Sequence, residues 1–303
     1  MKTTNKHGLP APMVEALQAE TYDPGDCDYS ISQLINPPQA IQLGLRHKDE
    51  IEEDVSDRVW SLLGTSVHYM IGLVADDKYM SEKRLFMNVD GCRISGQPDM
   101  FTTTGRLYDF KITSVWNYIY GSSIESWATQ LNCYAALIRN SGLWPASRAW
   151  KTCHMERLQV IAILRDWSKT KASFDRSYPQ AQVKTVDLNC WSDHNQDRYL
   201  MDRVQAHQDA SQLPDELLPP CSDEDRWHSS NTWALMKHGA KRASKVFDTE
   251  ESARSHAIEK GLSVGEGRGF YRIEFRQGEY RRCQDYCAGY QFCHQANHLV
   301  SLE

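Results

Sequence analysis

The chain has 303 residues, of which 41% are hydrophobic and 24% are charged, and its formal net charge is −6. This length provides a sizeable core for one large domain or two modest ones, and the acidic balance excludes attraction to nucleic acid over the whole surface, so DNA would need a local basic face. The sequence has no apolar run long enough for a membrane span and no apolar stretch of a secretory signal at its start. We therefore expect a cytoplasmic protein with no membrane partner.

The first part of the chain predicts an arm followed by a helix. The first 25 or so residues, rich in Pro, Thr and Asp, are typical of a loosely held arm. From residue 59 to residue 74, apolar side chains recur at i, i+3, i+4 and i+7, which predicts an amphipathic helix with His68 off its apolar stripe. The stripe consists of Val59, Leu62, Leu63, Val67, Met70, Ile71 and Val74.

The next elements predict the fold class. Three segments with strand character, roughly 83 to 89, 92 to 98 and 106 to 112, are separated by turn sequences and predict an antiparallel meander. A helix at about 123 to 140, strands at 158 to 164 and 183 to 188, and a helix at about 192 to 211 follow. This order predicts an α/β fold in which a mixed central sheet is flanked by helices.

The strand "RLYDFKI", residues 106–112, carries a carboxylate and an ammonium group on one face. Because strand side chains alternate, Asp109 and Lys111 point to the same side. An isolated pair of this kind is usually an exposed ion pair of little energetic value. Here Asp99, at the end of the preceding strand, can lie beside Asp109, and two adjacent carboxylates repel each other unless a cation lies between them. Such oxygen ligands suit Mg²⁺ or Mn²⁺, and a neighbouring lysine can orient or deprotonate a water molecule.

Four short motifs occur in a fixed order: "GTSVH" at 64–68, "GQPD" at 96–99, "DFK" at 109–111 and "QLNCY" at 130–134. In order and spacing they resemble the PD-(D/E)xK nuclease superfamily. They are most similar to its RecB-type branch, which includes the CRISPR-associated adaptation nucleases and phage recombination exonucleases. The resemblance covers about residues 30 to 165 and implies a restriction-endonuclease-like core.

The resemblance also implies a metal site. His68, Asp99 and Asp109 would ligate Mg²⁺ or Mn²⁺, with the carbonyl of Ile112 as a further ligand, and Lys111 would position the attacking water. The third acid in this family is often Glu, so Asp109 is a variant with a shorter reach. Without this context, His68 would more often be a partly buried histidine bonded to a backbone group.

Two more positions belong to the same hypothesis. The resemblance implies that Gln130 and Tyr134, one helical turn apart, contact the scissile DNA backbone or orient Lys111. Both could instead lie at the edge of the core. Glu82 could also approach the site, with a weaker expectation of a role.

The cysteines form a second group. Cys283, Cys287 and Cys293 lie within eleven residues, and Cys221 precedes them. Four thiols suit an iron–sulfur cluster or a structural Zn²⁺, and because zinc sites more often show C-x₂-C pairs, the C-x₃-C and C-x₅-C spacings favour iron–sulfur. Similar RecB-type nucleases carry a [4Fe–4S] cluster with one cysteine before the histidine motif, but the corresponding stretch here holds two prolines. The fourth ligand is therefore Cys221 or, as the alternative, Cys27.

The remaining cysteines are read as small core residues. They are Cys92, Cys133, Cys153 and Cys190.

A basic stretch lies between Cys221 and Cys283. We expect its cations to follow DNA phosphates, with Trp227 and Trp233 available to stack on unpaired bases, unless the stretch is an ordinary solvated face. The cations are Arg226, Lys237, Lys241, Arg242 and Lys245.

Together these features predict a metal-dependent DNA exonuclease acting in recombination, repair or phage replication, in the host cytoplasm if it is encoded by a phage. We expect a nuclease core over 25–212 and a basic, cysteine-bearing segment over 213–303 packed on it. The partners would be single- or double-stranded DNA ends and a single-strand annealing or binding protein. The alternatives are a catalytically inactive DNA-end binding protein and an iron–sulfur redox sensor.

Overall fold

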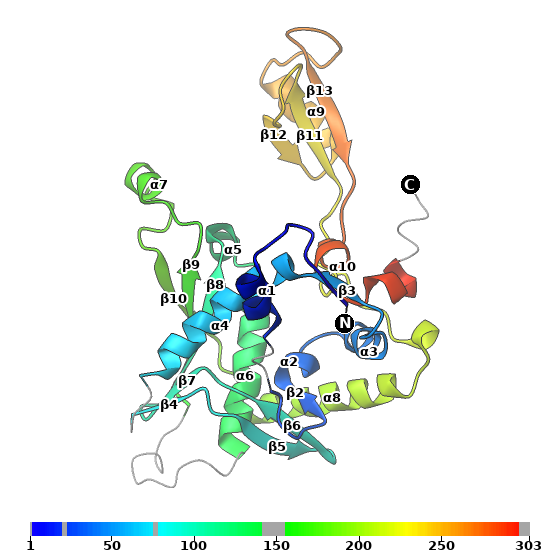
Figure 1. The fold of residues 1–303 in the computed structure, drawn as a ribbon. Coiled ribbons are helices and arrows are strands. Elements are labelled where there is room, and N and C mark those ends of the chain that lie inside the picture. Colours follow the sequence, from blue (N-terminus) through cyan, green and yellow to red (C-terminus); the bar gives the residue numbers. More distant parts are fainter. Residues whose placement is uncertain (1, 20–22, 75–77, 141–154, 297–303) are drawn as a thin grey trace. The chain divides into compact units, whose positions relative to one another are not determined.

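The computed structural model describes residues 2–19, 23–74, 78–140 and 155–296 (Figure 1). The chain divides into two compact units, Met1–Leu218 and Pro219–Glu303, here called the N-terminal and C-terminal units. The sequence placed this division at 212/213. Each unit is described separately below.

A five-stranded mixed sheet organises the N-terminal unit. Its strand order is β10-β9-β8-β7-β4, in which β8 and β9 are parallel and every other pair is antiparallel. The strands are β4 (Tyr79–Ser81), β7 (Met100–Thr102), β8 (Arg106–Thr113), β9 (Arg157–Leu164) and β10 (Val183–Leu188). The fold class expected from the sequence, a mixed α/β arrangement, is therefore present.

A smaller sheet lies beside it, and it corrects the expected meander. Its order is β2-β6-β5, with β2 at Tyr29–Ser30, β5 at Leu85–Val89 and β6 at Cys92–Gly96. The β5–β6 hairpin is antiparallel as expected, but β8 belongs to the five-stranded sheet, so the three-strand meander is wrong. The chain leaves the small sheet at Gly96, and Pro98 follows, which has no N–H to continue a ladder.

Helix α6 (Ile124–Asn140) lies at the centre of the N-terminal unit (Figure 1). It contacts β5 and β6 of the small sheet, β8, β9 and β10 of the large sheet, and helix α8 (Asp193–Ser211). Its buried side chains, Leu131 and Leu137 among them, join Leu107, Leu158 and Ile94 from the strands in one hydrophobic core. The helices predicted at 123–140 and 192–211 and the strands predicted at 158–164 and 183–188 are confirmed.

Shorter elements complete the N-terminal unit. They are β1 (Lys2–Thr4), α1 (Ala11–Gln18), α2 (Ile31–Leu34), α3 (Pro38–Arg46), β3 (Glu52–Asp54), η1 (Val55–Arg58), α5 (Val115–Tyr120), α7 (Lys169–Phe174) and η2 (Asp215–Leu217). Ser30 caps α2 in a reciprocal capping box with Gln33. The expectation of a loose N-terminal arm is wrong over much of its length, because β1 pairs with β3 and Leu17 of α1 is buried.

Helix α4 (Val59–Gly72) forms where the apolar period predicts it, but none of its residues is buried. Leu63, Met70 and, just beyond the helix, Val74 are exposed, although the sequence assigned them to a core-facing stripe. Helix α4 contacts α1, η1 and β8.

The C-terminal unit contains an antiparallel sheet of order β12-β11-β13, formed by β11 (Thr232–Lys237), β12 (Lys245–Phe247) and β13 (Tyr271–Arg276). Helix α9 (Glu250–Glu259) packs on this sheet and buries Ala253 and Ala257. The last described elements are α10 (Arg281–Asp285) and η3 (Tyr290–Phe292), which carry or flank the three C-terminal cysteines.

Candidate metal centre

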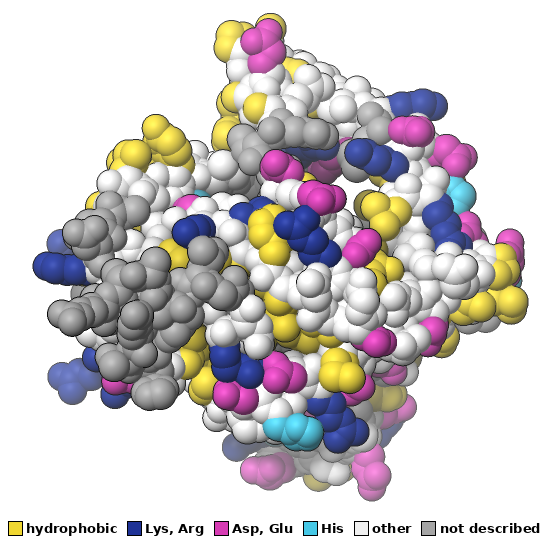
Figure 2. Space-filling view, turned by 90° about the horizontal axis from the view of Figure 1, so that it is seen from below, with side chains coloured by type: hydrophobic (Ala, Val, Ile, Leu, Met, Phe, Trp, Pro, Cys, Tyr) yellow, Lys and Arg dark blue, Asp and Glu magenta, His cyan; other side chains and the backbone are white. Residues whose placement is uncertain are grey.

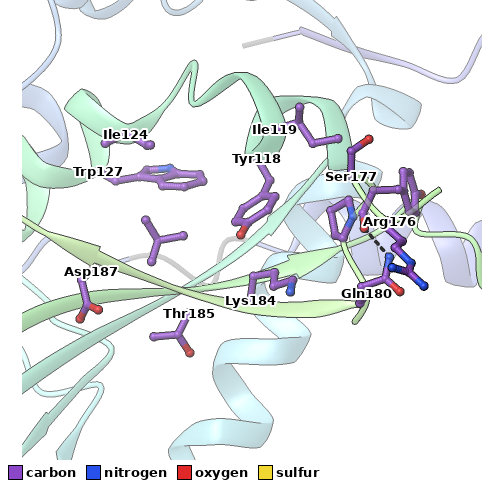
Figure 3. Close-up of a pocket in the computed structure, with 13 residues that line it drawn as sticks. Tyr118, Ile119, Ile124, Trp127, Arg176, Ser177, Gln180, Lys184, Thr185 and Asp187 are labelled. Atoms are coloured by element: carbon purple, nitrogen blue, oxygen red, sulfur yellow. Dashed lines mark hydrogen bonds between the residues drawn. The ribbon is translucent and has the colours of Figure 1, made fainter. Parts of the chain in front are cut away.

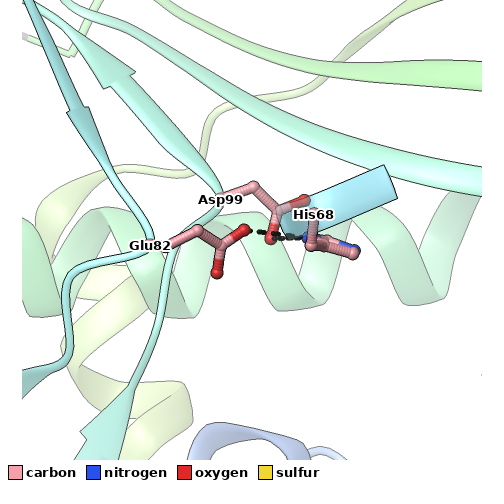
Figure 4. Close-up of side chains that lie close together, drawn as sticks. All are labelled: His68, Glu82 and Asp99. Carbon is pink, nitrogen blue, oxygen red and sulfur yellow. Dashed lines mark hydrogen bonds and ion pairs between the residues drawn. The ribbon is translucent and has the colours of Figure 1, made fainter. Parts of the chain in front are cut away.

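His68, Glu82 and Asp99 bring one ligand atom each to a common point, within 4.8 Å of one another (Figure 4). His68 comes from α4, Glu82 follows β4, and Asp99 precedes β7. Nδ1 of His68 lies 3.0 Å from Oε1 of Glu82 and 3.4 Å from Oδ1 of Asp99. The hydrogen bond that His68 donates to the carboxylate of Glu82 raises the pKa of His68 by more than burial lowers it. An imidazole and two carboxylates form a donor set that suits a divalent cation.

The backbone at Glu82 is held in an unusual conformation. Its φ is 49°, in the left-handed region that non-glycine residues seldom adopt. Two hydrogen bonds hold it there: its N–H donates to the carbonyl of Asp99 over 3.0 Å, and Nε2 of Gln97 donates to Oε2 over 2.7 Å. Arg84 in turn donates to Oε1 of Gln97 over 2.8 Å. The surrounding chain thus fixes this carboxylate beside His68 at a cost in backbone strain, which is a common property of functional sites.

Asp99 is buried, with 5% of its surface exposed, and its carboxylate joins two strands. Oδ2 accepts a hydrogen bond from the backbone N–H of Phe110 on β8 over 2.7 Å. Burial, and then the negative charge of Asp109, raise the pKa of Asp99 to about 7. The structure therefore places Asp99 and Asp109 near each other, as the sequence predicts, and a bound cation would relieve their repulsion.

The buried Asp109 and the partly exposed Lys111 form an ion pair on β8. Asp109 is only 1% exposed, which rules out the alternative of an ordinary surface ion pair. Nζ of Lys111 donates to Oδ1 of Asp109 over 3.0 Å and lies 2.9 Å from Oδ2, but Oδ2 has no partner with hydrogen-bond geometry among the described residues. Burial alone would lower the pKa of Lys111, but the charges of Asp109 and Asp99 outweigh it and raise this pKa. Lys111 therefore stays an ammonium here and acts as a hydrogen-bond donor.

The backbone of β8 has a free edge at this site. Strand β7 pairs with β8 only at Leu107 and Tyr108, so from Asp109 onward β8 has no strand partner on that side within the described part of the chain. The N–H of Phe110 points to this edge, because it donates to Asp99. Alternate residues of a strand direct their backbone groups to the same edge, so the carbonyl of Ile112 faces that edge too. This orientation is compatible with the predicted role of Ile112 as a backbone ligand.

The expected ligand set and the observed cluster differ in one member. The sequence assigned His68, Asp99 and Asp109, whereas the compact cluster contains Glu82 in place of Asp109, whose carboxylate is paired with Lys111. Glu82 is the residue that sequence reasoning undervalued. Its signal was a carboxylate in the short segment just before β5, seventeen residues before Asp99.

Gln130 and Tyr134 lie on α6, and Nε2 of Gln130 is 3.1 Å from the hydroxyl oxygen of Tyr134. Tyr134 is buried, and its ring packs so close to Gly96 that a Cβ there would lie 2.9 Å from it. Of the two predicted roles, this burial favours orienting the neighbouring side chains over direct contact of Tyr134 with DNA.

The C-terminal unit gathers the four predicted cysteines. Burial raises the pKa of Cys221 to about 12, and the nearby thiols of Cys293 and Cys287 add to this shift. Burial also raises the pKa of Cys287, with contributions from Cys283 and Cys293, so Cys287 lies within electrostatic range of the other three thiols. The side-chain amide of Gln295 accepts from the N–H of Cys221 and donates to its carbonyl, which ties the two cysteine segments together.

The other described cysteines belong to the N-terminal unit. Sγ of Cys27, the alternative fourth ligand, lies in the N-terminal unit 3.2 Å from the hydroxyl of Ser95. Cys92 and Cys133 are buried as expected, whereas Cys190 is exposed, and Cys153 lies outside the described residues.

The predicted basic strip is only partly a surface feature. Arg226 is buried, with its guanidinium 3.4 Å from the centre of the Tyr280 ring, so its assignment to a DNA-binding face is wrong. The other four cations, Lys237, Lys241, Arg242 and Lys245, are exposed in the C-terminal unit.

A second basic segment was missed. Between residues 165 and 184 the N-terminal unit carries five cations and only two acids, Asp166 and Asp175, both of which accept hydrogen bonds from neighbouring residues. The cations are Arg165, Lys169, Lys171, Arg176 and Lys184. By contrast, basic and acidic side chains are interspersed on the face shown in Figure 2. The net positive charge of residues 165–184 was visible in the sequence.

Comparisons with known proteins add little to this geometry. No family model matches the chain, and no curated protein matches it. A solved structure titled "Crystal structure of SSO0001" is similar over 69% of this chain and 92% of that chain, with 13% sequence identity and a TM-score of 0.40. A likeness at this level assigns neither a family nor a function. None of the described helices has both the length and the apolar character needed to cross a membrane.

Proposed function

We propose that this protein is a divalent-metal-dependent DNA nuclease with a restriction-endonuclease-like core. The observation that carries the proposal is the convergence of His68, Glu82 and Asp99 beside the Asp109–Lys111 pair. Burial of the two carboxylates Asp99 and Asp109 at one place costs free energy, and such clusters occur mainly where they serve a function.

The residues present fit a bound Mg²⁺ or Mn²⁺. The cluster offers carboxylate oxygens and an imidazole within ligand distance of one another, and Oδ2 of the buried Asp109 lacks a hydrogen-bond donor among the described residues. Asp99 would lie between the two parts of the site, with His68 and Glu82 on one side and Asp109 on the other. When bound, the cation would supply Lewis-acid chemistry by neutralising charge that develops on a phosphate.

The side chains of the chain would do the rest. Lys111, which stays protonated, would orient a water molecule and donate a hydrogen bond to a phosphate oxygen. Glu82 would hold the imidazole of His68 in one orientation. Gln130, tethered to Tyr134, would keep the rim of the site ordered.

DNA is the substrate that this proposal includes. The exposed cations of each unit would contact phosphates. The guanidinium of Arg165 lies 4.1 Å from the centre of the exposed Trp60 ring, and such a cation–aromatic pair can hold a base or a phosphate. Action on DNA ends stays a prediction from the resemblance.

For the four thiols the proposal is an iron–sulfur cluster over zinc, because zinc sites more often show C-x₂-C pairs than the C-x₃-C and C-x₅-C spacings found here. We assign it a structural role, because Cys221 and Cys293 join segments distant in sequence.

The test uses anaerobically purified full-length protein on linear DNA labelled at the 5′ or the 3′ end, with Mn²⁺, Mg²⁺ or EDTA. Native protein and Lys111→Ala are compared, with Lys48→Ala as a matched control that removes an exposed lysine. We expect metal-dependent release of label by the native protein and by Lys48→Ala, and at least about 100-fold slower release by Lys111→Ala. If native protein binds DNA but cuts no substrate with any metal, the nuclease proposal fails.

A further inference from the structure

A cavity of about 640 Å³ lies in the N-terminal unit and is not part of the candidate metal centre. It is bounded by α5, by the start of α6, by the segment that follows α7 and by strand β10 (Figure 3). The rings of Tyr118 and Trp127 project from the helices toward the strand that carries Lys184 and Asp187. Its volume lies within the range of small-ligand pockets, about 300 to 1,000 Å³.

The charged groups of the cavity favour an anion. Arg176 and Lys184 line it, and neither forms an ion pair with a carboxylate among the described residues. The one acid in the lining, Asp187, is engaged elsewhere: its Oδ1 accepts from Nε2 of Gln159 over 2.7 Å and lies 4.0 Å from Nη1 of Arg157. The cavity therefore presents two uncompensated cations.

The other walls favour a flat ring. The partly buried Tyr118 and the buried Trp127 and Tyr178 border the cavity, and Pro179 lies next to them. Stacking on aromatic side chains binds any base, because every base has a π-face. An anion attached to an aromatic ring system is the chemistry of a nucleotide.

The register of the sheet connects this cavity to the metal centre. Lys111 on β8 pairs with Ala162 on β9, and Ala162 pairs with Lys184 on β10. Paired residues point to the same face, so Lys111 and Lys184 share one face of the sheet, with the buried Ala162 between them. Two strand spacings make about 10 Å.

We propose that the cavity binds the terminal nucleotide of the DNA strand whose backbone lies at the metal centre, with its phosphate monoester between Arg176 and Lys184. The proposal rests on the proposed function for the identity of the ligand. A terminal monoester carries about −1.5 to −2 charge at pH 7, which matches two cations better than the single charge of an internal diester does. The base would pack against Tyr118 and Trp127. Such a site would select phosphorylated ends and fix the length of the released product.

The experiment measures binding and needs no cutting. Fluorescence anisotropy is recorded for single-stranded oligonucleotides of one sequence that carry a 5′-phosphate, a 3′-phosphate or hydroxyls at both ends, in EDTA. Native protein is compared with Arg176→Ala/Lys184→Ala and with Lys48→Ala/Arg198→Ala. The control removes the same charge from exposed positions of the N-terminal unit outside the cavity. Thermal unfolding of each variant confirms that it is folded.

We expect native protein and the control to prefer one phosphorylated end by about tenfold over the hydroxyl end. The cavity variant should bind all three oligonucleotides equally, with the affinity that the native protein has for the hydroxyl form. The identity of the preferred end distinguishes 5′ from 3′ recognition. Tyr118→Leu, which keeps an apolar side chain, should weaken binding of all three about tenfold by removing the stacking surface.

Two results would overturn the proposal: native protein without any preference among the ends, or a cavity variant that keeps the preference. Neither result depends on catalysis. If the protein shows the end preference but cuts no DNA, the nuclease proposal fails and the end-binding cavity stands. If the protein cuts DNA without an end preference, the cavity proposal fails and the nuclease proposal stands.

Discussion

Lys111 donates a hydrogen bond to the carboxylate of Asp109, two residues earlier on the same strand, and this carboxylate is 1% exposed. The ammonium thus compensates the negative charge of Asp109, which a bound divalent cation would also do. We expect Lys111→Ala to bind Mn²⁺ at least as tightly as native protein, since a competing positive charge is gone, while its cleavage is lost. Asp109→Asn should weaken Mn²⁺ binding. Calorimetric titration measures the Mn²⁺ affinity of both variants. Weaker Mn²⁺ binding by Lys111→Ala would contradict the expectation and show that Lys111 favours binding of the cation.

Glu82 provides a second test of the metal centre. Glu82→Gln keeps a hydrogen-bonding side chain but removes the charge beside His68, and we expect Mn²⁺ affinity to fall about 10- to 100-fold. Glu53→Gln is the matched control, since Glu53 pairs with Arg58 in η1. If Glu82→Gln and Glu53→Gln bind Mn²⁺ with equal affinity, Glu82 is not a ligand. The ligand set implied by the resemblance, His68, Asp99 and Asp109, then replaces it.

The cysteine group predicts a metal content. Anaerobically purified protein should contain about four iron and four sulfide per chain, and Cys283→Ser should lose most of both, together with thermal stability. Cys27→Ser should keep them, because Cys27 lies against Ser95 in the N-terminal unit. About one zinc per chain without iron would overturn the cluster and leave a structural zinc site.

Gly96 explains why the second motif begins with glycine. A Cβ at this position would lie 2.7 Å from Cδ1 of Leu137, 2.9 Å from the ring of Tyr134 and 3.0 Å from Cγ1 of Ile31. Gly96→Ala should therefore lower the free energy of unfolding by about 1 to 3 kcal/mol through overpacking. Gly64→Ala is the control, because no atom lies within 4 Å of a Cβ built there and a helix favours alanine. Chemical denaturation of both variants gives the comparison, and equal midpoints would contradict the packing argument.

His207 predicts a pH dependence of stability. Burial, and then the charge of Arg203, lower its pKa to about 4, so the folded protein keeps this imidazole neutral where an unfolded chain, with a pKa near 6.5, takes up a proton. The unfolded state binds more protons between these values, and stability falls as pH drops from about 6.5 toward 4, by at most about 3 kcal/mol. His207→Gln should show a smaller fall over that window in urea denaturation. Parallel curves for the two proteins would disprove the contribution of His207.

Part of this structure follows from the sequence for local reasons. The periods of 3.6 and 2 place α6, α8, β9 and β10 within a residue or two, because each periodicity reflects which face must be buried. The alternation in "RLYDFKI" likewise places Asp109 and Lys111 on one face of β8. These are short-range consequences of backbone geometry and apolar burial.

Tertiary structure decided the rest. Strand β8 left the expected meander because Pro98 interrupts a ladder, and no residue of the apolar stripe within α4 is buried. A left-handed backbone conformation and hydrogen bonds to residues fifteen and seventeen positions later hold Glu82 at the metal centre. Strand pairing across β8, β9 and β10 places Lys184 in register with Lys111. Each of these depends on which distant segments meet. Single-chain periodicity holds no information on that choice, since loop closure and packing determine it jointly.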